Sequence, residues 1–435
     1  MLTQRRLILI LTFGAFIAAL WFILPQARVL NGYVARTVCS CHFEIKRSEQ
    51  QIVAEDLSGG FFSLARFNID EKSKSVSSSL FGISTKTAVY RKGLGCILLK
   101  GKDDYHIEFT VPPDSNKKVL PWEDVTGTTL DREAKNRIDI LAFDEGFSVS
   151  NKKTRALLIL HKDKLIYEQY ANGISRTTPL LGWSMTKSII STCAGILVKN
   201  GQLFLEERPF KTSPDPYKSN TSLKDLLQMR SGLDWEENYN QYSSATKMLF
   251  DSDNVFEQVG QLSFGEKQWE YSSGTTNLIS GILKSKFKTA EAYWQFPHTA
   301  LFHVLDLQHA WIEPDESGTY LGSSYMYATA QDWLKLGRLF LKKGNWQGTQ
   351  VIDSSWIDFV QLEAPGSQGR YGGHFWLNKN GISYPDAPHD MYTMDGYQGQ
   401  MVAMLPSHDM VVVRLGLEDI DFNQLLKTIL DEVEN

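Results

Sequence analysis

The sequence lacks several features that would indicate a partner or a cofactor. It has no block of basic residues, and its formal net charge is −5, so nucleic acid is not an expected partner. No phosphate-binding glycine loop and no HExxH motif is present, and no cysteine pair accompanies His298, His303 and His309, so we expect neither a cofactor nor a metal. A G-x-S-x-G nucleophile elbow is also absent. With 435 residues, 42% of them hydrophobic, the chain is long enough to bury a substantial core.

Cysteine is scarce, with four residues in the chain. Cys39 and Cys41 lie close together, Cys96 stands in the strand-like run GLGCILL, and Cys193 falls in an apolar helical stretch. In an oxidising compartment, a disulfide from Cys39 or Cys41 to Cys96 is expected. The alternative is four reduced thiols that pack as small apolar side chains.

One uncharged stretch follows Arg5 and Arg6. Residues 7–24 carry no charge and reach the lower limit of length for a helix that crosses a bilayer. The positive-inside rule keeps the two arginines in the cytoplasm and sends the rest outward. A cleaved signal peptide is the alternative, although PQA at residues 25–27 is a poor cleavage site. We expect a single-pass anchor in a bacterial inner membrane, with the rest of the chain in the periplasm.

Three segments differ in pattern: the anchor (1–24), a strand-rich region (25–135) and a larger mixed region (136–435). The strand-rich region has extended runs near residues 88–90, 96–99 and 106–111 and no motif that indicates a role. The larger region begins and ends with strand hairpins and is mostly helical between them. This order predicts an α+β fold in which both hairpins complete one antiparallel sheet flanked by helices, with an inserted helical lobe.

The stretch PLLGWSMTKSII places Ser184 three residues before Lys187. Four other Ser-x-x-Lys tetrapeptides lie in polar, lysine-rich surroundings, whereas the surroundings of Lys187 are apolar and disfavour its charged form. On a helix the amine can reach the serine hydroxyl and take its proton. Free N–H groups at the helix start can stabilise an oxyanion. The alternative is a serine N-cap followed by a lysine whose amine reaches solvent.

Two further motifs follow Ser184 and Lys187 in the chain, Tyr271-Ser272-Ser273 and Tyr397-Gln398-Gly399. Together the three motifs resemble the penicillin-recognising serine hydrolases, the superfamily of class C β-lactamases, D,D-peptidases and related esterases. Order and spacing are most similar to the 6-aminohexanoate-dimer hydrolase branch, over roughly residues 150–435. The segments that carry the resemblance are LLGWSMTKS, LLQMRSGL, YSSGTTNLISGIL and GQMVAMLPSHDMVVVRLG.

The resemblance implies a β-lactamase-like fold and a role for each matching residue. Ser184 would be the acylated nucleophile, Lys187 its base, and Tyr271 the group that relays the proton to the leaving group and later helps to activate water. The backbone N–H groups of Ser184 and Gln400 would form the oxyanion hole, so replacing the Gln400 side chain is expected to matter less than inserting a residue there. Substrate-binding roles would fall to Ser273, Tyr397, Gln398 and Gly399.

Two departures from the superfamily's pattern bear on the substrate. Ser273 stands where many relatives have asparagine, and Tyr397-Gln398-Gly399 where many have Lys-Thr-Gly. The groups that would hold the acylamino group and the carboxylate of a β-lactam are therefore missing. We expect hydrolysis of a small ester or amide through an acyl-enzyme. The alternatives are a non-catalytic binder or sensor, and a true β-lactamase or D,D-peptidase. Oligomeric state is left open.

Overall fold

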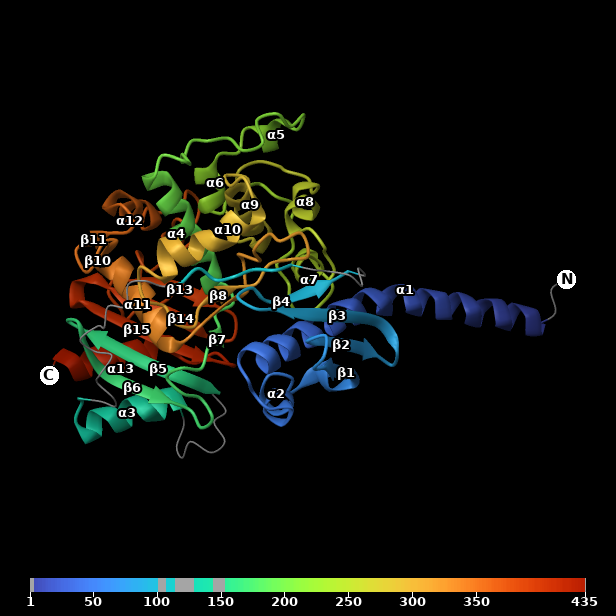
Figure 1. Cartoon of the computed structure of the whole chain (residues 1–435), viewed down its shortest axis with the longest axis horizontal. Coiled ribbons are helices and arrows are strands. Elements are labelled where there is room, and N and C mark those ends of the chain that lie inside the picture. The colour runs from blue at the N-terminus through green and yellow to red at the C-terminus, as the bar shows by residue number, and fades with distance from the viewer. Residues whose placement is uncertain (1–3, 101–106, 114–128, 144–152, 435) are drawn as a thin grey trace.

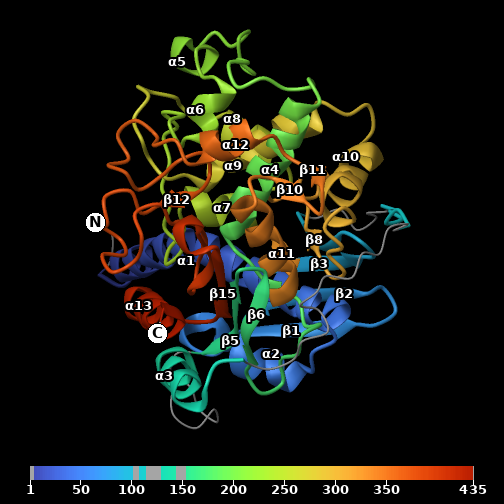
Figure 2. The same ribbon diagram turned by 90° about the vertical axis from the view of Figure 1, so that its left-hand side faces the viewer.

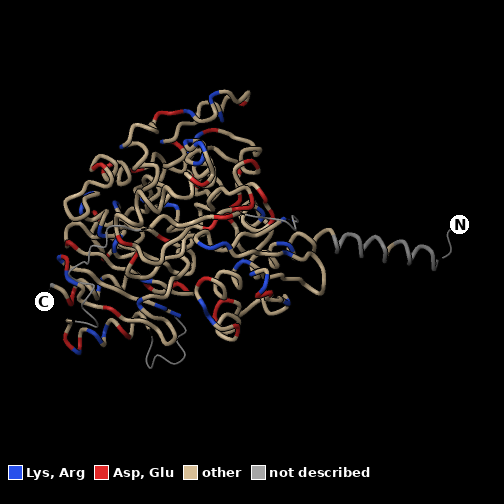
Figure 3. Tube along the Cα trace, viewed as in Figure 1, with Lys and Arg blue, Asp and Glu red and all other residues tan. Residues whose placement is uncertain are grey.

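The computed structural model describes residues 4–100, 107–113, 129–143 and 153–434. It shows a mixed α/β fold built around antiparallel sheets (Figure 1). Basic and acidic residues are interspersed along the described trace (Figure 3), as the scattered charges of the sequence predict.

The largest sheet has six strands in the order β12-β13-β14-β15-β5-β6. Its first hairpin consists of β5 (Thr154–His161) and β6 (Lys164–Tyr170), and its later strands are β12 (Trp376–Leu377), β13 (Tyr392–Gly396), β14 (Gln400–Leu405) and β15 (Met410–Gly416). Strand β15 pairs antiparallel with β5, so the first and last hairpins complete one sheet, as predicted. All side chains of β14 and β15 are buried, which indicates cover on both faces.

Helices supply that cover. On one face lie α4 (Met185–Lys199) and α11 (Ala330–Leu341), whose apolar side chains share a core with alternate strand residues. On the other face α3 (Arg132–Phe143) and α13 (Phe422–Glu434) lie side by side (Figure 2) and pack on the remaining strand residues. The predicted boundary between the strand-rich region and the larger mixed region, at residues 135/136, falls inside α3.

A mostly helical segment lies between β6 and β12, as predicted. Its helices are α5 (Pro216–Ser219), α6 (Leu223–Leu227), α7 (Ser244–Phe250), α8 (Val255–Gly260), α9 (Ser273–Lys284), α10 (Ala290–Pro297) and α12 (Ser354–Val360). Short strands run among them: β7 (Leu180–Leu181), β8 (Trp311–Ile312), β9 (Met326–Ala328), β10 (Asn345–Trp346) and β11 (Thr349–Gln350). Strand β7 pairs with β9, and the Ser184 motif follows β7 in the chain.

The N-terminal region combines a long helix with a four-stranded antiparallel meander. Its elements are α1 (Gln4–Cys39), α2 (Glu49–Glu55), β1 (Ala65–Asp70), β2 (Ser75–Leu80), β3 (Ile83–Arg91) and β4 (Gly95–Leu99). Two of the three predicted extended runs lie in β3 and β4. The third, 106–111, was wrong for 107–111, which form no strand, and His106 lies outside the described residues.

Buried polar contacts attach α1 to the larger region at Glu313, and a disulfide attaches α1 to β4 of its own region. The guanidinium of Arg36 lies 3.6 Å from the carboxylate of Glu313, and both side chains are almost fully buried. Glu313 also accepts hydrogen bonds from the Ser40 hydroxyl and from the Cys96 backbone N–H. Cys39 and Cys96 form a disulfide, which resolves the pairing that the sequence left open. Cys41 and Cys193 are buried free thiols.

The predicted anchor, residues 7–24, lies within α1. A search of the described residues finds no helix with the length and apolar character needed to cross a membrane. Most side chains of residues 7–24 are outside that description.

Candidate active site

Ser184 stands immediately before α4, at a sharp bend in the chain. The preceding residue, Trp183, has a positive φ of 47°, a conformation that L-residues rarely adopt. The Ser184 side chain is partly exposed and makes no capping hydrogen bond to the helix. The hydroxyl is therefore available for chemistry, and the N-cap alternative does not describe this site.

Lys187 projects from the first turn of α4 and is buried, with 2% of its surface exposed. Its Nζ lies 2.8 Å from the Oγ of Ser184, 3.0 Å from the Oγ of Ser273 and 3.0 Å from the carbonyl oxygen of Ser323. Burial lowers the pKa of Lys187 to about 8, and the negative charge of Glu237 acts in the opposite direction. With this pKa about a tenth of the amine is neutral at pH 7, and the neutral fraction rises with pH.

The hydrogen-bond network dictates where the lone pair of that neutral amine points. The Ser273 hydroxyl donates its proton to Glu237 at 2.5 Å, so it accepts from Lys187, as does the carbonyl of Ser323. A neutral amine has two hydrogens to donate and one lone pair. With both hydrogens engaged, the lone pair is left for the hydroxyl proton of Ser184. This is the arrangement that a general base requires.

Tyr271 completes the group. Its hydroxyl is hydrogen bonded to the side chain of Ser184, and its ring centroid lies 4.8 Å from the Nζ of Lys187. The ring stacks on that of Trp376 at 5.2 Å, which fixes its orientation. Burial, followed by the charge of Glu237, raises the pKa of the phenol well above its ordinary value. Tyr271 therefore stays protonated at neutral pH and can give a proton but not remove one.

Ser273 is placed differently from the sequence prediction. It is the first residue of α9 and is fully buried, and its hydroxyl is engaged by Lys187 and Glu237 rather than facing a ligand. A serine side chain is too short to reach beyond these partners. Ser273 thus belongs to the network that surrounds the lysine.

Sequence reasoning missed Glu237. Its carboxylate accepts from the backbone N–H of Ser273 at 2.8 Å, from the indole N–H of Trp235 at 2.5 Å and from the hydroxyl of Tyr239 at 2.9 Å. It lies in a loop between α6 and α7, in the stretch DWEENYN. That stretch has neither periodicity nor a recognisable motif, and only the fold brings it beside Lys187.

The third motif forms the turn between β13 and β14. Tyr397 is 50% exposed, and its ring lies edge-on to that of Trp183 at 5.6 Å. The side-chain oxygen of Gln398 accepts from the indole N–H of Trp183. Gly399 has a φ of 72°, and a Cβ there would lie 2.5 Å from the Nη1 of Arg414. Both constraints require glycine.

The side chain of Gln400 fastens this turn to β15. Its Nε2 donates to the carbonyls of Tyr397 at 3.0 Å, Gln398 at 3.1 Å and Gly416 at 2.6 Å, and its Oε1 accepts from the N–H of Gly416 at 3.1 Å. This side chain therefore has a structural role in the turn, which the sequence did not reveal. That replacing it matters less than inserting a residue there stays a prediction. The proposed role of the Gln400 backbone N–H is a separate question and stays a prediction.

Gly396, the last residue of β13, pairs with Gln400 and was not singled out by the sequence. A Cβ at Gly396 would lie 2.3 Å from the carbonyl oxygen of Gly182, two residues before Ser184. Glycine is what lets this strand end pack against the chain leading to the serine.

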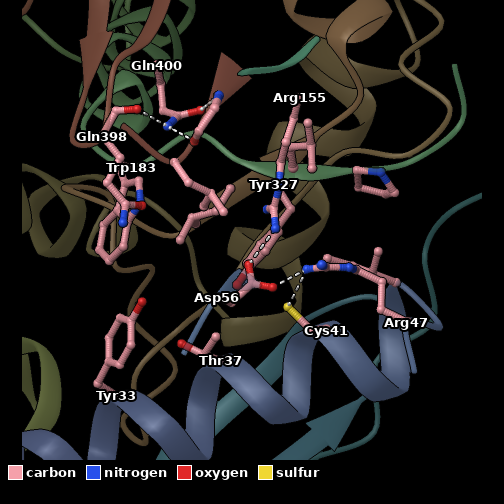
Figure 4. A pocket seen from close by; sticks show the side chains of 16 residues that line it. Tyr33, Thr37, Cys41, Arg47, Asp56, Arg155, Trp183, Tyr327, Gln398 and Gln400 are labelled. Carbon is pink, nitrogen blue, oxygen red and sulfur yellow. Dashed lines mark hydrogen bonds and ion pairs between the residues drawn. The ribbon is translucent and has the colours of Figure 1, made fainter. Parts of the chain in front are cut away.

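A separate cavity lies between the N-terminal region and the large sheet, and Trp183 is one of its lining residues (Figure 4). In it Asp56 is paired with Arg47 and with Arg155 of β5, whose Nη2 lies 3.1 Å from the carboxylate. Cys41 lies beside Arg47, and burial raises the pKa of its thiol to about 12. The thiol is therefore protonated and unreactive. Ser184, Lys187 and Tyr271 do not line this cavity.

A model of the Beta-lactamase family matches residues 152–416, more than half of the chain. The chain belongs to the Beta-lactamase family. It is a serine hydrolase, an amidase or esterase by class, which confirms the superfamily resemblance of its three motifs.

The chain is 24% identical over 293 residues to the 6-aminohexanoate-dimer hydrolase of Paenarthrobacter ureafaciens, covering 60% of this chain and 72% of that protein. In structure it is similar to a Bacillus anthracis protein assigned as a 6-aminohexanoate-dimer hydrolase, with a TM-score of 0.57, 17% identity and coverage of 71% and 86%. It is also similar to the hydrolase EstCE1, with a TM-score of 0.55, 15% identity and coverage of 69% and 98%. At these identities the structural similarity establishes the fold.

Proposed function

We propose that this family member hydrolyses a small ester or amide through a covalent acyl-enzyme on Ser184. The observation that carries the proposal is the 2.8 Å separation between the Ser184 hydroxyl and the amine of Lys187, whose pKa is lowered by burial. Neither the relative's substrate nor a β-lactam is implied for this chain, because the two departures at Ser273 and at residues 397–399 remain.

In the acylation step, Lys187 removes the Ser184 proton while the oxygen attacks the substrate carbonyl. The negative charge that develops is held by main-chain N–H groups, for which we propose those of Ser184 and Gln400. As the carbon–oxygen or carbon–nitrogen bond breaks, Tyr271 gives its proton to the departing alcohol or amine. The proton on Lys187 then restores the phenol.

In the deacylation step, water attacks the acyl carbonyl and its proton passes to Lys187, while the protonated Tyr271 can position the water by a hydrogen bond. The bond between the Ser184 oxygen and the acyl carbon breaks, the serine recovers a proton, and the carboxylic acid leaves. The overall reaction requires water as its co-reactant and no other compound.

The test uses the full chain with a fluorophosphonate probe and p-nitrophenyl acetate. We expect the probe to label wild-type protein but not Ser184→Ala, and ester turnover to disappear in the same variant. Lys187→Ala should fold normally and acylate at least about a hundredfold more slowly. Absence of both labelling and turnover in folded wild-type protein would refute the proposal.

A non-catalytic binder is the alternative that the two departures favour. It predicts that Ser184→Ala leaves ligand affinity unchanged while the wild type turns nothing over. A true β-lactamase or D,D-peptidase would instead turn over nitrocefin or be labelled stably by penicillin.

We further propose a single-pass anchor at residues 7–24 and a periplasmic catalytic domain. The uncharged stretch after Arg5 and Arg6 supports this placement, as does the Cys39–Cys96 disulfide, since disulfides persist in oxidising compartments. Protease digestion of spheroplasts tests it. The hydrolase should be cleaved from outside in intact spheroplasts and recovered with membranes before digestion, and a protected or unattached protein would contradict the placement.

A further inference from the structure

A small cavity of ≈ 90 Å³ lies beside the reactive group and is lined by two parts of the chain that are far apart in sequence. The N-terminal side contributes Val29, Leu30 and Tyr33 of α1 and Phe62 of the 3-10 helix η2 (Gly60–Leu64). The hydrolase side contributes Trp183, Tyr239, Thr246, Phe250, Tyr397 and Gln398.

The cavity adjoins the reactive atoms through two of its walls. Trp183 directly precedes Ser184 in the chain. The hydroxyl of Tyr239 lies 3.1 Å from the Oγ of Ser273, which in turn is hydrogen bonded to Lys187. A substrate carbonyl held at Ser184 would therefore have this cavity within reach.

Eight of the ten lining residues are aliphatic or aromatic, the other two are Thr246 and Gln398, and none of the ten is charged. The ring of Tyr33 lies 4.7 Å from that of Phe62 and 5.8 Å from that of Phe250, and the rings of Tyr239 and Tyr397 stack at 5.8 Å. Such a surface gains free energy by burying a hydrocarbon group and offers no counter-ion to a charged one.

The N-terminal wall lies outside the part of the chain that matches the family. Residues 29–62 precede residue 152, where that match begins. The wall is nevertheless attached to the hydrolase part, since Arg36 and Ser40 of this region contact the buried carboxylate of Glu313. The position of Leu30 relative to Ser184 is thus set by the fold and not by a loose tether.

The leaving group of the substrate would lie on a different side of the site from this cavity. Tyr271, the proposed proton donor to the departing alcohol or amine, does not line the cavity and packs instead against Trp376 and Tyr371. The cavity is therefore assigned to the other half of the substrate, the acyl group.

We propose that this enzyme prefers esters or amides whose acyl group carries an apolar alkyl chain, and that Leu30, Tyr33 and Phe62 of the N-terminal region form its binding wall. The inference rests on the proposed acyl-enzyme function. In the reaction the alkyl chain occupies the cavity while Ser184 becomes acylated, and the acid released by water carries the same chain.

The experiment compares p-nitrophenyl acetate, butyrate and hexanoate on full-length wild type, Leu30→Trp and Val53→Trp. Val53 lies on α2, is exposed and does not line the cavity, so it controls for added bulk. We expect wild-type kcat/KM to rise about tenfold from acetate to hexanoate. Leu30→Trp should lose that gain, so that its ratio of hexanoate to acetate kcat/KM falls about tenfold below the wild-type ratio, because the chain pocket is filled. Val53→Trp should behave as the wild type.

Leu30→Ala is the second variant, and it decides the matter if the tryptophan variant does not fold. It enlarges the cavity and should shift the preference toward the longer chain. The assignment would be overturned by a flat chain-length profile in the wild type, or by an equal loss on acetate and hexanoate in Leu30→Trp. A second series, n-alkyl acetates of varied alcohol length, would overturn it if chain length had its effect there and not in the acyl series. Failure of the proposed function is distinct, since it would appear as no acetate turnover and no fluorophosphonate label on wild-type Ser184.

Discussion

The indole N–H of Trp183 donates to the side-chain oxygen of Gln398 across 3.2 Å, and both residues have positive φ, 47° and 63°. The bond joins the residue before the proposed nucleophile to the turn between β13 and β14. Left-handed backbone costs on the order of 1–2 kcal/mol per non-glycine residue, so each conformation needs support from its surroundings. These two bends support each other.

Gln398→Ala tests that support. Loss of one hydrogen bond of about 1 kcal/mol should lower kcat/KM for p-nitrophenyl acetate about fivefold, because Ser184 is held less tightly. The melting temperature should change little. Gln347→Ala is the matched control, since Gln347 also has positive φ, in the β10–β11 turn away from the site. Equal activity in the two variants would show that the Trp183 contact does not position the serine.

The acylation rate should depend on pH through Lys187. Only the neutral amine accepts a proton, and the pKa of Lys187 is lowered to about 8. The rate should therefore rise with pH, fall about tenfold per unit well below pH 8, and level off above it. Single-turnover acylation between pH 6 and 9.5 measures this. A flat profile would mean that another group is the base.

Glu237→Gln should move that profile to lower pH. The negative charge of Glu237 favours the ammonium form of Lys187, so removing it makes the amine easier to deprotonate and lowers its pKa. The midpoint of the ascending limb is the readout, since a merely structural defect would reduce the rate at every pH alike. Glu236→Gln, at the exposed neighbouring acid, should leave the midpoint in place.

The Cys39–Cys96 disulfide should stabilise the whole protein. Its cysteines are 57 residues apart, and cross-links of this span contribute about 2–4 kcal/mol. Replacing both cysteines by serine should lower the free energy of unfolding by about that amount in urea titrations. Cys193→Ala removes a buried thiol without breaking a cross-link and should cost clearly less. Equal stability of the two variants would show that the cross-link between α1 and β4 does not stabilise the protein.

The sheet could be predicted because its signals are local. Strands β5 and β15 are apolar runs next to tight turns, and their positions at the two ends of the hydrolase region left few ways to pair them. The Ser184–Lys187 contact was predictable for the same reason, since residues three apart on a helix share one face. Tyr271 could be placed beside them only through the resemblance, because the sequence around Tyr271 does not indicate that it lies near α4.

What could not be predicted depends on contacts between distant segments. Glu237 comes from an irregular loop, and its effect on Lys187 arises only when α9 brings Ser273 between them. The four hydrogen bonds of the Gln400 side chain reach across to β15. The role proposed for residues 25–135 could not be predicted for the same reason, because only the fold brings Leu30 and Phe62 into one cavity with Trp183.

Residues from inside and outside the family-matched region line that cavity, and this matters for selective inhibition. A reactive phosphonate or carbamate engages the attacking oxygen alone, which every active member of the family possesses, so it would strike them all. An inhibitor with a hydrocarbon arm that reaches Leu30 and Phe62 would draw part of its affinity from a segment that the family's shared region does not include. Chemical probes built in this way would single out this enzyme in a cell that contains many of its relatives.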